Sequence, residues 1–499
     1  MKLDQLLAGV AEPPKGKSNL EITGVQFDSR QVKAGDVFVA LPGTKADGVA
    51  FAADAVNKGA VAVVASKDVA GVKVPVIKVA DARQAIALLA ANFYKQPAKE
   101  LRLLGITGTN GKTTTAWLLE SICQSGGATC GLMGTIETRF QGKRLPPTHT
   151  TPDPVGLHRT FREMVDQGVD TVVMEVSSHA LDQQRVHGLQ FSTAAFTNLS
   201  RDHLDYHSDM ETYFQAKRAL FTSLLSPTGT AVVNGDDTYC NRIYNELRNE
   251  KRAAWRFSRA GNGEISAANV EMTPRGIKAT LKTFAGDIAV KSTLVGPHNL
   301  ENILCAAGMA LSAGYSRRDV QEGIERVERV PGRMERVESK GITALIDYAH
   351  TDDALRKALE SARSVTKGRL IVVFGAGGDR DKGKRPLMGE AAGELSDIPI
   401  VTSDNPRGED PDEIISGITP GLEKQGLRRM GVAKAKQGER GYIVEADRAA
   451  AIALAASLAK DGDVLLIAGK GHEKYQEQEG EKKPFNDLEV AAKALGTSP

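Results

Sequence analysis

The sequence predicts an α/β protein of about three domains. Its 499 residues are enough for about three domains, since a typical domain has roughly 150 residues. Apolar, strand-like runs alternate with helical patterns on both sides of two polar or Pro/Gly breaks, near residues 97 and 331. A glycine-rich segment between a strand-like run and a helical pattern begins near residue 105. Strands that alternate with helices indicate parallel sheets covered on both faces.

The first block is residues 1–97. It predicts strands at 36–40 and 60–65 and helices at 51–58 and 81–94, and the polar segment 95–100 is typical of a linker.

The second block, residues 98–331, contains the most informative motif, Gly105-Ile-Thr-Gly-Thr-Asn-Gly-Lys-Thr-Thr-Thr115. Glycines allow backbone N–H groups to turn toward an anion, and the following helix adds its positive end. Lys112 can reach terminal phosphates and Thr113 can ligate Mg²⁺. Ile106 stands where the strict pattern has glycine, so the loop is a variant; the alternative is a strand-to-helix turn without a ligand.

Further strands and helices are expected in this block. The strands are 170–176, 193–197 and 230–234, a strand-rich stretch covers 264–294, and the helices are 210–225 and 299–313. Glu175 ends a strand, where parallel sheets place ligand groups, so it can complement Thr113 at Mg²⁺; a solvated strand-end carboxylate is the alternative.

The third block, residues 332–499, restarts the alternation with strands at 344–347, 369–374, 399–402 and 463–468. Its Gly375-Ala-Gly-Gly-Asp-Arg380 resembles a dinucleotide fingerprint, but Arg380 stands at the third glycine position, so we reject a nicotinamide site.

Composition excludes several classes. With 64 Lys+Arg against 62 Asp+Glu, the net charge of +2 favours neither nucleic acid nor anionic membranes as partners. The four cysteines lack the spacing of a zinc site or a disulfide framework. The N-terminal apolar patch is too short for a signal peptide, so a cytoplasmic protein is expected.

Five motifs, in the order in which the family carries them, resemble those of the Mur ligases, which are amide-forming enzymes of cell-wall synthesis. They are Gly108-Thr-Asn-Gly-Lys-Thr113, Met174-Glu-Val-Ser-Ser-His179, Asn198-Leu-Ser-Arg-Asp-His-Leu-Asp-Tyr-His207, Gly332-Arg-Met-Glu335 and Asp347-Tyr-Ala-His-Thr351. The resemblance implies an N-terminal UDP-sugar-binding domain (1–97), a central phosphate-loop, parallel-sheet ATPase domain (98–331) and a Rossmann-like, amino-acid-binding C-terminal domain (332–499). It also implies ATP and Mg²⁺ as cofactors and a monomer.

Asp404-Asn-Pro-Arg407 stands where one branch of the family selects its amino acid. That branch adds meso-diaminopimelate to UDP-N-acetylmuramoyl-L-alanyl-D-glutamate. A guanidinium can grip the distal carboxylate that distinguishes diaminopimelate from lysine, with discrimination of about 10⁴ or more in favourable sites. The alternatives are a turn at Asn405-Pro406, a lysine-adding or folylpolyglutamate synthase-like ligase, and a nucleotide-hydrolysing switch.

Carried over residue by residue, the resemblance implies these site residues. The metal ligands are Thr113, Glu175, His203 and a carbamylated Lys217, with Lys112 acting on phosphate; the nucleotide contacts are Gly108, Thr109, Asn110, Gly111, Lys112, Thr113, Thr114, Asn302, Arg333 and Asp347. The uridine end is Phe27, Ser29, Thr44, Lys45 and Ala46; the muramoyl-peptide contacts are His149, Thr150, Thr151, Ser177, Gln183 and Arg185. The amino-acid contacts are Arg380, Asp404, Asn405, Pro406, Arg407, Gly469 and Glu473, with Glu473 expected on the distal ammonium and the arginines on carboxylates.

Three residues depart from the family pattern: His149 for asparagine, His298 for phenylalanine and Asp352 for proline. The implied mechanism is phosphorylation of the peptide carboxylate, followed by attack of the amino acid's α-amine. Because the acyl phosphate must be kept from water, we expect the C-terminal domain to close about the linker near Pro331.

Overall fold

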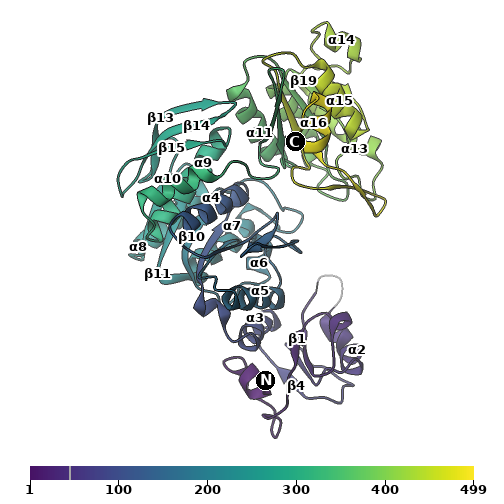
Figure 1. Ribbon diagram of the computed structural model, residues 1–499. Coiled ribbons are helices and arrows are strands. Elements are labelled where there is room, and N and C mark those ends of the chain that lie inside the picture. Colours follow the sequence, from purple (N-terminus) through teal and green to yellow (C-terminus); the bar gives the residue numbers. More distant parts are fainter. Residues whose placement is uncertain (44–46, 499) are drawn as a thin grey trace.

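The computed structural model describes residues 1–43 and 47–498. The chain forms three α/β units in sequence order, with the first at one end of an elongated molecule and the last two side by side at the other (Figure 1). We call them the N-terminal, central and C-terminal domains. Thr44, Lys45 and Ala46, predicted at the uridine end, lie outside the described residues.

The N-terminal domain contains a four-stranded sheet in the order β1-β2-β3-β4, and its strand pairs are parallel. Its elements are α1 (Leu3–Leu7), β1 (Gly24–Gln26), η1 (Ser29–Gln31), β2 (Asp36–Ala40), η2 (Gly48–Phe51), α2 (Ala52–Asn57), β3 (Ala62–Ala65), β4 (Val76–Lys78), α3 (Ala82–Phe93) and η3 (Pro97–Glu100). Helix α3 begins where the Asp81 carboxylate accepts hydrogen bonds from the N–H groups of Arg83 and Gln84.

The central domain is built on an eight-stranded sheet in the order β12-β11-β10-β5-β9-β6-β7-β8. Its first elements are β5 (Arg102–Thr107), α4 (Lys112–Ser125), β6 (Cys130–Met133), β7 (Thr138–Phe140), β8 (Lys143–Leu145), α5 (Pro154–Asp166), β9 (Thr171–Glu175), α6 (Ser178–Asp182), β10 (Phe191–Phe196) and α7 (Met210–Ala219). They are followed by the π-helical η4 (Leu220–Leu224), β11 (Leu225–Asn234), α8 (Thr238–Asn249), β12 (Ala254–Phe257), β13 (Ser266–Thr273), β14 (Gly276–Lys282), β15 (Ile288–Ser292), α9 (Pro297–Ser312) and α10 (Arg317–Arg326).

The strands from β12 to β6 are parallel, as the alternation predicts, but β7 and β8 extend the edge in antiparallel hairpins. These strands have only three residues each, too short to give a periodic signal. Strands β13 to β15 form a separate antiparallel sheet within the predicted strand-rich stretch.

The C-terminal domain has a six-stranded sheet in the order β16-β17-β21-β18-β19-β20. Its elements are β16 (Glu335–Ser339), β17 (Ile342–Asp347), α11 (Asp352–Val365), β18 (Leu370–Phe374), α12 (Lys384–Leu395), β19 (Ile398–Val401), α13 (Pro411–Lys424), α14 (Val432–Lys436), β20 (Ile443–Val444), α15 (Arg448–Leu458), β21 (Val464–Ala468), β22 (Tyr475–Gln478), β23 (Glu481–Pro484) and α16 (Asp487–Leu495). Only β16 pairs antiparallel to its neighbour among the strands of this sheet that the structure describes.

The helix predicted over 210–225 is α7 only as far as Ala219. A single π turn follows, and strand β11 already begins at Leu225. Leu220, Phe221 and Leu224 are buried, so they continue the apolar pattern that the helix prediction used. Hydrophobic spacing alone does not distinguish a buried helix from the turn that ends it.

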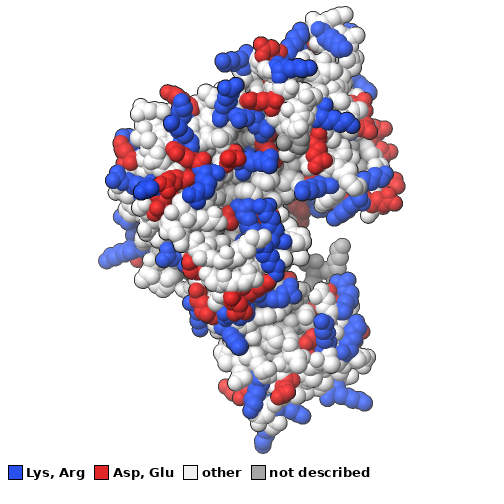
Figure 2. All heavy atoms as spheres, in the orientation of Figure 1, with Lys and Arg blue, Asp and Glu red and all other residues white. Residues whose placement is uncertain are grey.

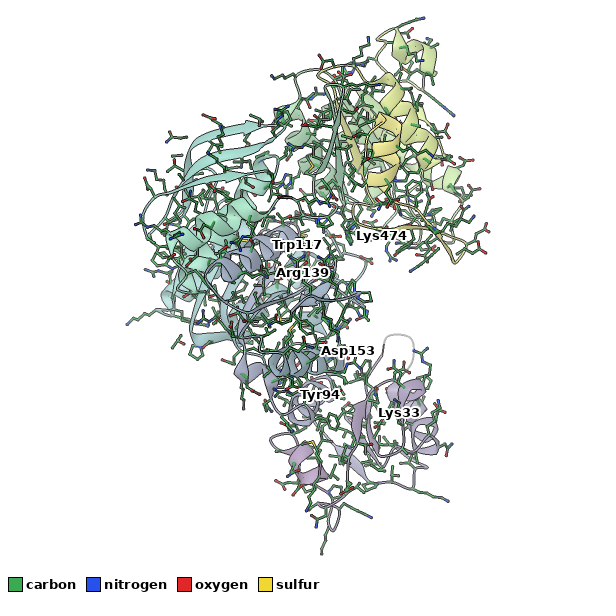
Figure 3. The ribbon with its side chains drawn as sticks, in the orientation of Figure 1. Lys33, Tyr94, Trp117, Arg139, Asp153 and Lys474 are labelled. Carbon is green, nitrogen blue, oxygen red and sulfur yellow. The ribbon has the colours of Figure 1, made fainter. Side chains whose placement is uncertain are left out.

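Apolar side chains pack on both faces of the central sheet. Leu104 and Ile106 of β5 lie in the core on one face, whereas Leu103 lies in the core on the other. This alternation is what a parallel sheet covered by helices on both sides requires. At the edge of the domain Arg139 lies over Trp117, with its guanidinium carbon 3.7 Å from the ring centre (Figure 3).

Basic and acidic side chains are interspersed over the face shown in Figure 2, in line with the small net charge, and this face is hollowed where the C-terminal domain overhangs its neighbours. Among the described residues, no helix combines the length and the apolar character that crossing a membrane requires.

Candidate active site

The phosphate-loop motif lies between β5 and α4, as predicted. Gly108 has φ +144° and Gly111 has φ +88°, the region that favours glycine. A Cβ on Gly108 would lie 1.9 Å from Thr197 Oγ1, and one on Gly111 would lie 2.4 Å from Asn302 Oδ1. These two glycines are therefore required by backbone conformation and by close packing together.

Lys112 is folded back over its own loop. Its Nζ donates hydrogen bonds to Gly108 O at 2.9 Å and to Thr109 O at 2.8 Å. Burial lowers the pKa of Lys112, and the nearby Glu175 carboxylate acts in the opposite direction. In the described part of the chain, Lys112 Nζ donates to these two carbonyl groups at the N-terminus of α4, where it can bind an anionic ligand.

A cavity of about 510 Å³ opens over this loop, and both the central and the C-terminal domain contribute to it. Of the predicted nucleotide contacts, it is lined by Thr109, Asn110, Gly111, Lys112, Thr113, Thr114, Asn302, Arg333 and Asp347. Arg333 reaches across from the C-terminal domain, and its Nη2 donates to Thr113 Oγ1 at 3.2 Å. The structure thus brings together residues that are more than 200 positions apart.

Three of the four predicted metal ligands line the same cavity: Thr113, Glu175 and His203. Glu175 is buried, and its carboxylate accepts hydrogen bonds from Thr135 N and Thr135 Oγ1, both at 2.9 Å. Burial lowers the pKa of His203 to about 4, so its imidazole is neutral at pH 7, the form that binds metals.

Lys217, the fourth predicted ligand, is fully buried beside the phosphate loop. Its Nζ donates to Gly108 O at 2.8 Å and lies 4.7 Å from the centre of the Tyr213 ring. Burial, and then the charge of Lys112, lowers the pKa of Lys217 well below its ordinary value. A neutral amine is the form that can add CO₂.

These donors fit Mg²⁺ in chemistry but do not form a ready-made cage. Hydroxyl and carboxylate oxygens are its preferred ligands, and a carbamate on Lys217 would add a second carboxylate. Over residues 1–43 and 47–498, no group of three or more His, Cys, Asp or Glu side chains is close enough to hold a metal ion. The predicted set is therefore incomplete without a modified lysine, water or phosphate oxygens.

The predicted muramoyl-peptide contacts lie close together, and two of them, Thr150 and Ser177, line this cavity. Arg185 Nη1 donates to Thr151 O at 3.0 Å, and its Nη2 donates to Gln183 Oε1 at 2.7 Å. Thr151 Oγ1 accepts from Ser177 N at 3.0 Å, and Thr150 Oγ1 lies 3.1 Å from Thr135 Oγ1. Burial, and then the Arg185 charge, lowers the pKa of His149. His149, which stands where the family has asparagine, therefore lies near the same cluster.

The described residues predicted at the uridine end, Phe27 and Ser29, line neither this cavity nor the amino-acid cavity described next. Ser29 is buried, and its carbonyl accepts a hydrogen bond from Lys58 Nζ at 3.2 Å. Gln184 Nε2 donates to Asp81 Oδ2 at 3.2 Å, which links the N-terminal domain to the segment carrying Gln183 and Arg185.

A second cavity, of about 270 Å³, lies between the C-terminal domain and the segment Arg201–Asp205. Six of the seven predicted amino-acid contacts line it: Arg380, Asp404, Asn405, Arg407, Gly469 and Glu473; Pro406 does not. Arg407 Nη1 donates to Gly378 O at 2.7 Å, and its Nε lies 3.9 Å from Glu477 Oε2. Its guanidinium therefore has donors left for a ligand carboxylate.

Glu473 already has protein partners that the sequence did not indicate. Its Oε2 accepts hydrogen bonds from Asn405 Nδ2 at 2.8 Å and from the buried Lys470 Nζ at 3.2 Å. A ligand ammonium at Glu473 would share that carboxylate with Lys470. Assignment of the distal ammonium to Glu473 remains a prediction.

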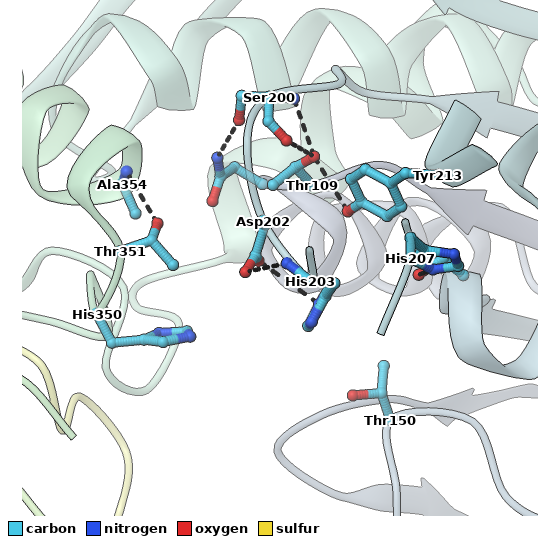
Figure 4. Close-up of polar contacts among 12 residues, drawn as sticks. Thr109, Thr150, Ser200, Asp202, His203, His207, Tyr213, His350, Thr351 and Ala354 are labelled. Atoms are coloured by element: carbon cyan, nitrogen blue, oxygen red, sulfur yellow. Dashed lines mark hydrogen bonds and ion pairs between the residues drawn. The ribbon is translucent and has the colours of Figure 1, made fainter. Parts of the chain in front are cut away.

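The two cavities share walls, and the shared residues were not among the predicted contacts except for His203. Asp202, His203, Tyr348, His350 and Thr351 line both. Figure 4 shows Asp202 and His203 on one side of the gap and His350 and Thr351 on the other. Asp202, Tyr348, His350 and Thr351 belong to motifs that the sequence singled out, so motif membership could have found them. Lys384 and Lys470 carry no such signal.

Comparison with known proteins agrees with this geometry. Mur ligase family models match residues 21–94 ("Mur ligase family, catalytic domain"), 106–310 ("Mur ligase middle domain") and 332–471 ("Mur ligase, glutamate ligase domain"). The chain belongs to the Mur ligase family. The family assignment and the three-domain α/β fold predicted from the motifs are thereby confirmed.

Two full-length relatives bear the same name. Proteins of Geobacter sulfurreducens (45% identical, covering 100% of this chain and 99% of the relative) and Bacillus licheniformis (42%, 99% and 99%) are both called UDP-N-acetylmuramoyl-L-alanyl-D-glutamate--2,6-diaminopimelate ligase. A solved structure of a ligase with that name is 32% identical, covers 99% of each chain and superposes with a TM-score of 0.72.

Proposed function

We propose that this Mur ligase joins meso-diaminopimelate to UDP-N-acetylmuramoyl-L-alanyl-D-glutamate, with ATP converted to ADP and phosphate. Full-length relatives with 41–46% identity that carry this activity in their name support the assignment. The reaction belongs to the synthesis of peptidoglycan precursors, and a cytoplasmic monomer is the form we propose.

The continuity of the two cavities is the structural observation that carries the proposal. A phosphate-binding cavity and a cavity lined by Arg380, Asp404 and Arg407 share the walls formed by Asp202, His203 and His350. An enzyme that transfers an acyl group from phosphate to an amine needs this connection, because the two reacting groups must meet. A nucleotide-hydrolysing switch has no need of the second cavity.

The chemistry requires ATP because a carboxylate cannot expel oxide when an amine attacks it. Phosphorylation of the peptide carboxylate gives an acyl phosphate, whose leaving group is phosphate. Lys112 and Arg333 lie beside the phosphate loop and can neutralise charge as the phosphoryl group is transferred. Arg185, Thr151 and Ser177 are proposed to hold the peptide acid facing this loop.

Thr113, Glu175, His203 and a carbamylated Lys217 are the proposed ligands of Mg²⁺, which when bound supplies positive charge beside the phosphates. Burial, and then the Lys112 charge, lowers the pKa of Lys217 well below its ordinary value, which favours the neutral amine that adds CO₂ and so supports the carbamate. Mass spectrometry of the intact protein under CO₂, compared with a Lys217→Arg variant, tests it: a bicarbonate-dependent gain on the parent alone is expected.

On the amino-acid side, we propose that Arg407 and Arg380 bind carboxylates of diaminopimelate. The α-amine has a pKa near the ordinary value of about 8, so a useful fraction is neutral at physiological pH. We also propose domain boundaries at residues 97/98 and 331/332, which fall between the segments 21–94, 106–310 and 332–471 that the family models match.

Phosphate release and tripeptide formation test the function directly. The purified chain is assayed with ATP, Mg²⁺, the UDP-dipeptide and each of diaminopimelate, lysine and ornithine. Phosphate release that needs both the UDP-dipeptide and diaminopimelate is expected, with one tripeptide formed per phosphate. Equal turnover of lysine would remove the selectivity claim. Nucleotide turnover without any amino acid would favour the switch.

A further inference from the structure

His350 occupies the place where the two cavities meet. It follows β17 and precedes α11 in the C-terminal domain, and it lines both cavities together with Asp202 of the central domain. In Figure 4 its ring points from the C-terminal domain across the gap toward Asp202 and His203. The function proposed above gives this residue no role.

Hydrogen bonding fixes which ring nitrogen of His350 is free. Its Nδ1 lies 2.9 Å from Tyr348 O, and a carbonyl oxygen can only accept, so Nδ1 carries the hydrogen. In a neutral imidazole the lone pair is then on Nε2. Within the described part of the chain no protein group forms a hydrogen bond to Nε2, which leaves that lone pair for a molecule in the cavity.

The backbone around His350 is held on both sides. Lys384 Nζ donates to His350 O at 2.9 Å, and the next residue, Thr351, caps α11 by accepting from Ala354 N at 3.3 Å. The Tyr348 ring lies 4.7 Å from the His350 ring, centre to centre. A fixed ring with a free acceptor nitrogen is a preorganised proton acceptor.

Burial is the main reason that the His350 ring is neutral. Burial lowers the pKa of His350, the Lys384 ammonium lowers it further, and the Asp202 and Asp404 carboxylates act in the opposite direction. His472, packed on Tyr348, also faces this group, and burial lowers its own pKa to about 3. The acceptor form of His350 therefore predominates at physiological pH.

We propose that His350 accepts the proton that the incoming amine loses as the amide forms, an inference that rests on the proposed function. The nitrogen lone pair of the neutral amine attacks the acyl-phosphate carbon, and a C–N bond forms. An N–H proton passes to His350 Nε2. The C–O bond to phosphate then breaks, phosphate leaves with the electron pair, and the imidazolium returns its proton to solvent.

The other nearby groups are poorer acceptors. Asp202 Oδ1 already accepts a hydrogen bond from His203 N at 2.8 Å, and its Oδ2 lies 3.5 Å from His203 Nε2. The Nζ of Lys384 donates to the His350 backbone, so its nitrogen is directed at a carbonyl group. Glu473 already accepts two hydrogen bonds at Oε2.

The test separates the two half-reactions in the full-length enzyme. ADP–ATP isotope exchange with the UDP-dipeptide alone reports acyl-phosphate formation, whereas tripeptide synthesis also needs the amine step. His350→Asn keeps an amide N–H for Tyr348 O and removes the Nε2 acceptor. Exchange should stay within about twofold of the parent, and tripeptide synthesis should fall by about 10²- to 10⁴-fold.

The pH profile gives a readout that a purely structural role would not change. In the parent, Nε2 must be unprotonated to accept a proton, so the rate of the amine step should fall at acid pH. The pKa of this acid limb should lie below the ordinary histidine pKa of about 6.5. His350→Asn should lose that limb. His187→Asn is the matched control, because His187 lines neither cavity, and it should keep both rate and limb.

An equal loss in both half-reactions, or no loss in either, would overturn the role of His350. His350→Gln, tested in parallel, guards against a folding defect peculiar to the asparagine variant, and intact exchange shows that either variant is folded. A parent enzyme that exchanges ATP but never joins diaminopimelate would instead reject the proposed function.

Discussion

The two cavities at the domain junction are built in opposite ways. The phosphate-loop wall of the larger cavity comes from one continuous segment, residues 109–114, at the junction of β5 and α4. The amino-acid cavity takes Arg380, Arg407 and Glu473 from the loops after β18, β19 and β21, which are neighbours in the sheet but lie far apart along the chain. A local motif thus specifies phosphate binding, while selectivity depends on how separate loops converge.

If this contrast is right, damage to the continuous segment should have the largest effect. Lys112→Met removes the cation that faces the phosphate loop, and we expect kcat to fall by about 10³-fold with every amino acid. Phosphate release measures the loss. Calorimetric binding of the UDP-dipeptide, which should be unchanged, is the control. Activity within tenfold of the parent would mean that phosphate is bound elsewhere.

A change in the convergent cavity should alter selectivity while sparing the nucleotide. Arg407→Lys replaces the planar guanidinium with a point charge. We expect kcat/KM to fall by about 10²-fold with diaminopimelate as the substrate and to change little with free lysine as the substrate. The KM for ATP should stay constant. Loss of activity with both amino acids to the same degree would contradict a carboxylate-selecting role for Arg407.

The contact that joins the two regions should have an intermediate effect. Asp353 Oδ2 of α11 accepts hydrogen bonds from Ser200 Oγ at 2.5 Å and from Asn110 Nδ2 at 3.0 Å in the central domain. Asp353→Ala removes both, and we expect kcat/KM to fall about tenfold through a less favourable closed arrangement. Small-angle scattering with nucleotide and both substrates measures closure. If the scattering profiles of parent and variant coincided in every ligand state, Asp353 would have no role in domain closure.

A change outside both cavities should affect stability alone. His158 of α5 is buried, its Nδ1 has no hydrogen-bond partner among the described residues, and burial lowers its pKa to about 4. The folded state therefore binds fewer protons than the unfolded chain, whose histidine pKa is about 6.5, so stability is lost as pH falls through that value. As the pH falls from 7.5 to 6, we expect this histidine to lower the free energy of unfolding by about 1 kcal/mol.

Denaturant titrations of the parent and of His158→Leu check this expectation. The variant should lose that part of the pH dependence, and its kcat should match the parent. An unchanged pH dependence would mean that His158 is protonated in the folded protein or already neutral in the unfolded one.

Sequence patterns located most strands of the three largest sheets, because buried parallel strands are continuous apolar runs. Strand β2 covers the predicted 36–40, and β9 ends at Glu175, one residue before the end of the predicted strand. The short hairpin strands β7 and β8 and the π turn after Ala219 were not predicted. Three residues carry too little periodicity, and a buried turn shares the apolar composition of the helix it ends.

The residues of the candidate site were predicted where a motif held them together. Gly108 to Thr114 need only their neighbours in the chain to form an anion site, and Asp404 and Arg407 lie in one short segment. Asp202 and His350 lie in recognised motifs, yet their shared position between the cavities was not predicted. Lys470, which pairs with Glu473, had no signal at all.

The sequence by itself determined the family, the order of the α/β elements and the phosphate loop, because glycine conformation, helix starts and apolar runs are local properties. Tertiary structure decided that Arg333 reaches Thr113, that two cavities share a wall, and that the free nitrogen of His350 faces it. Those relations join residues hundreds of positions apart, and their distances depend on how two separately packed domains meet.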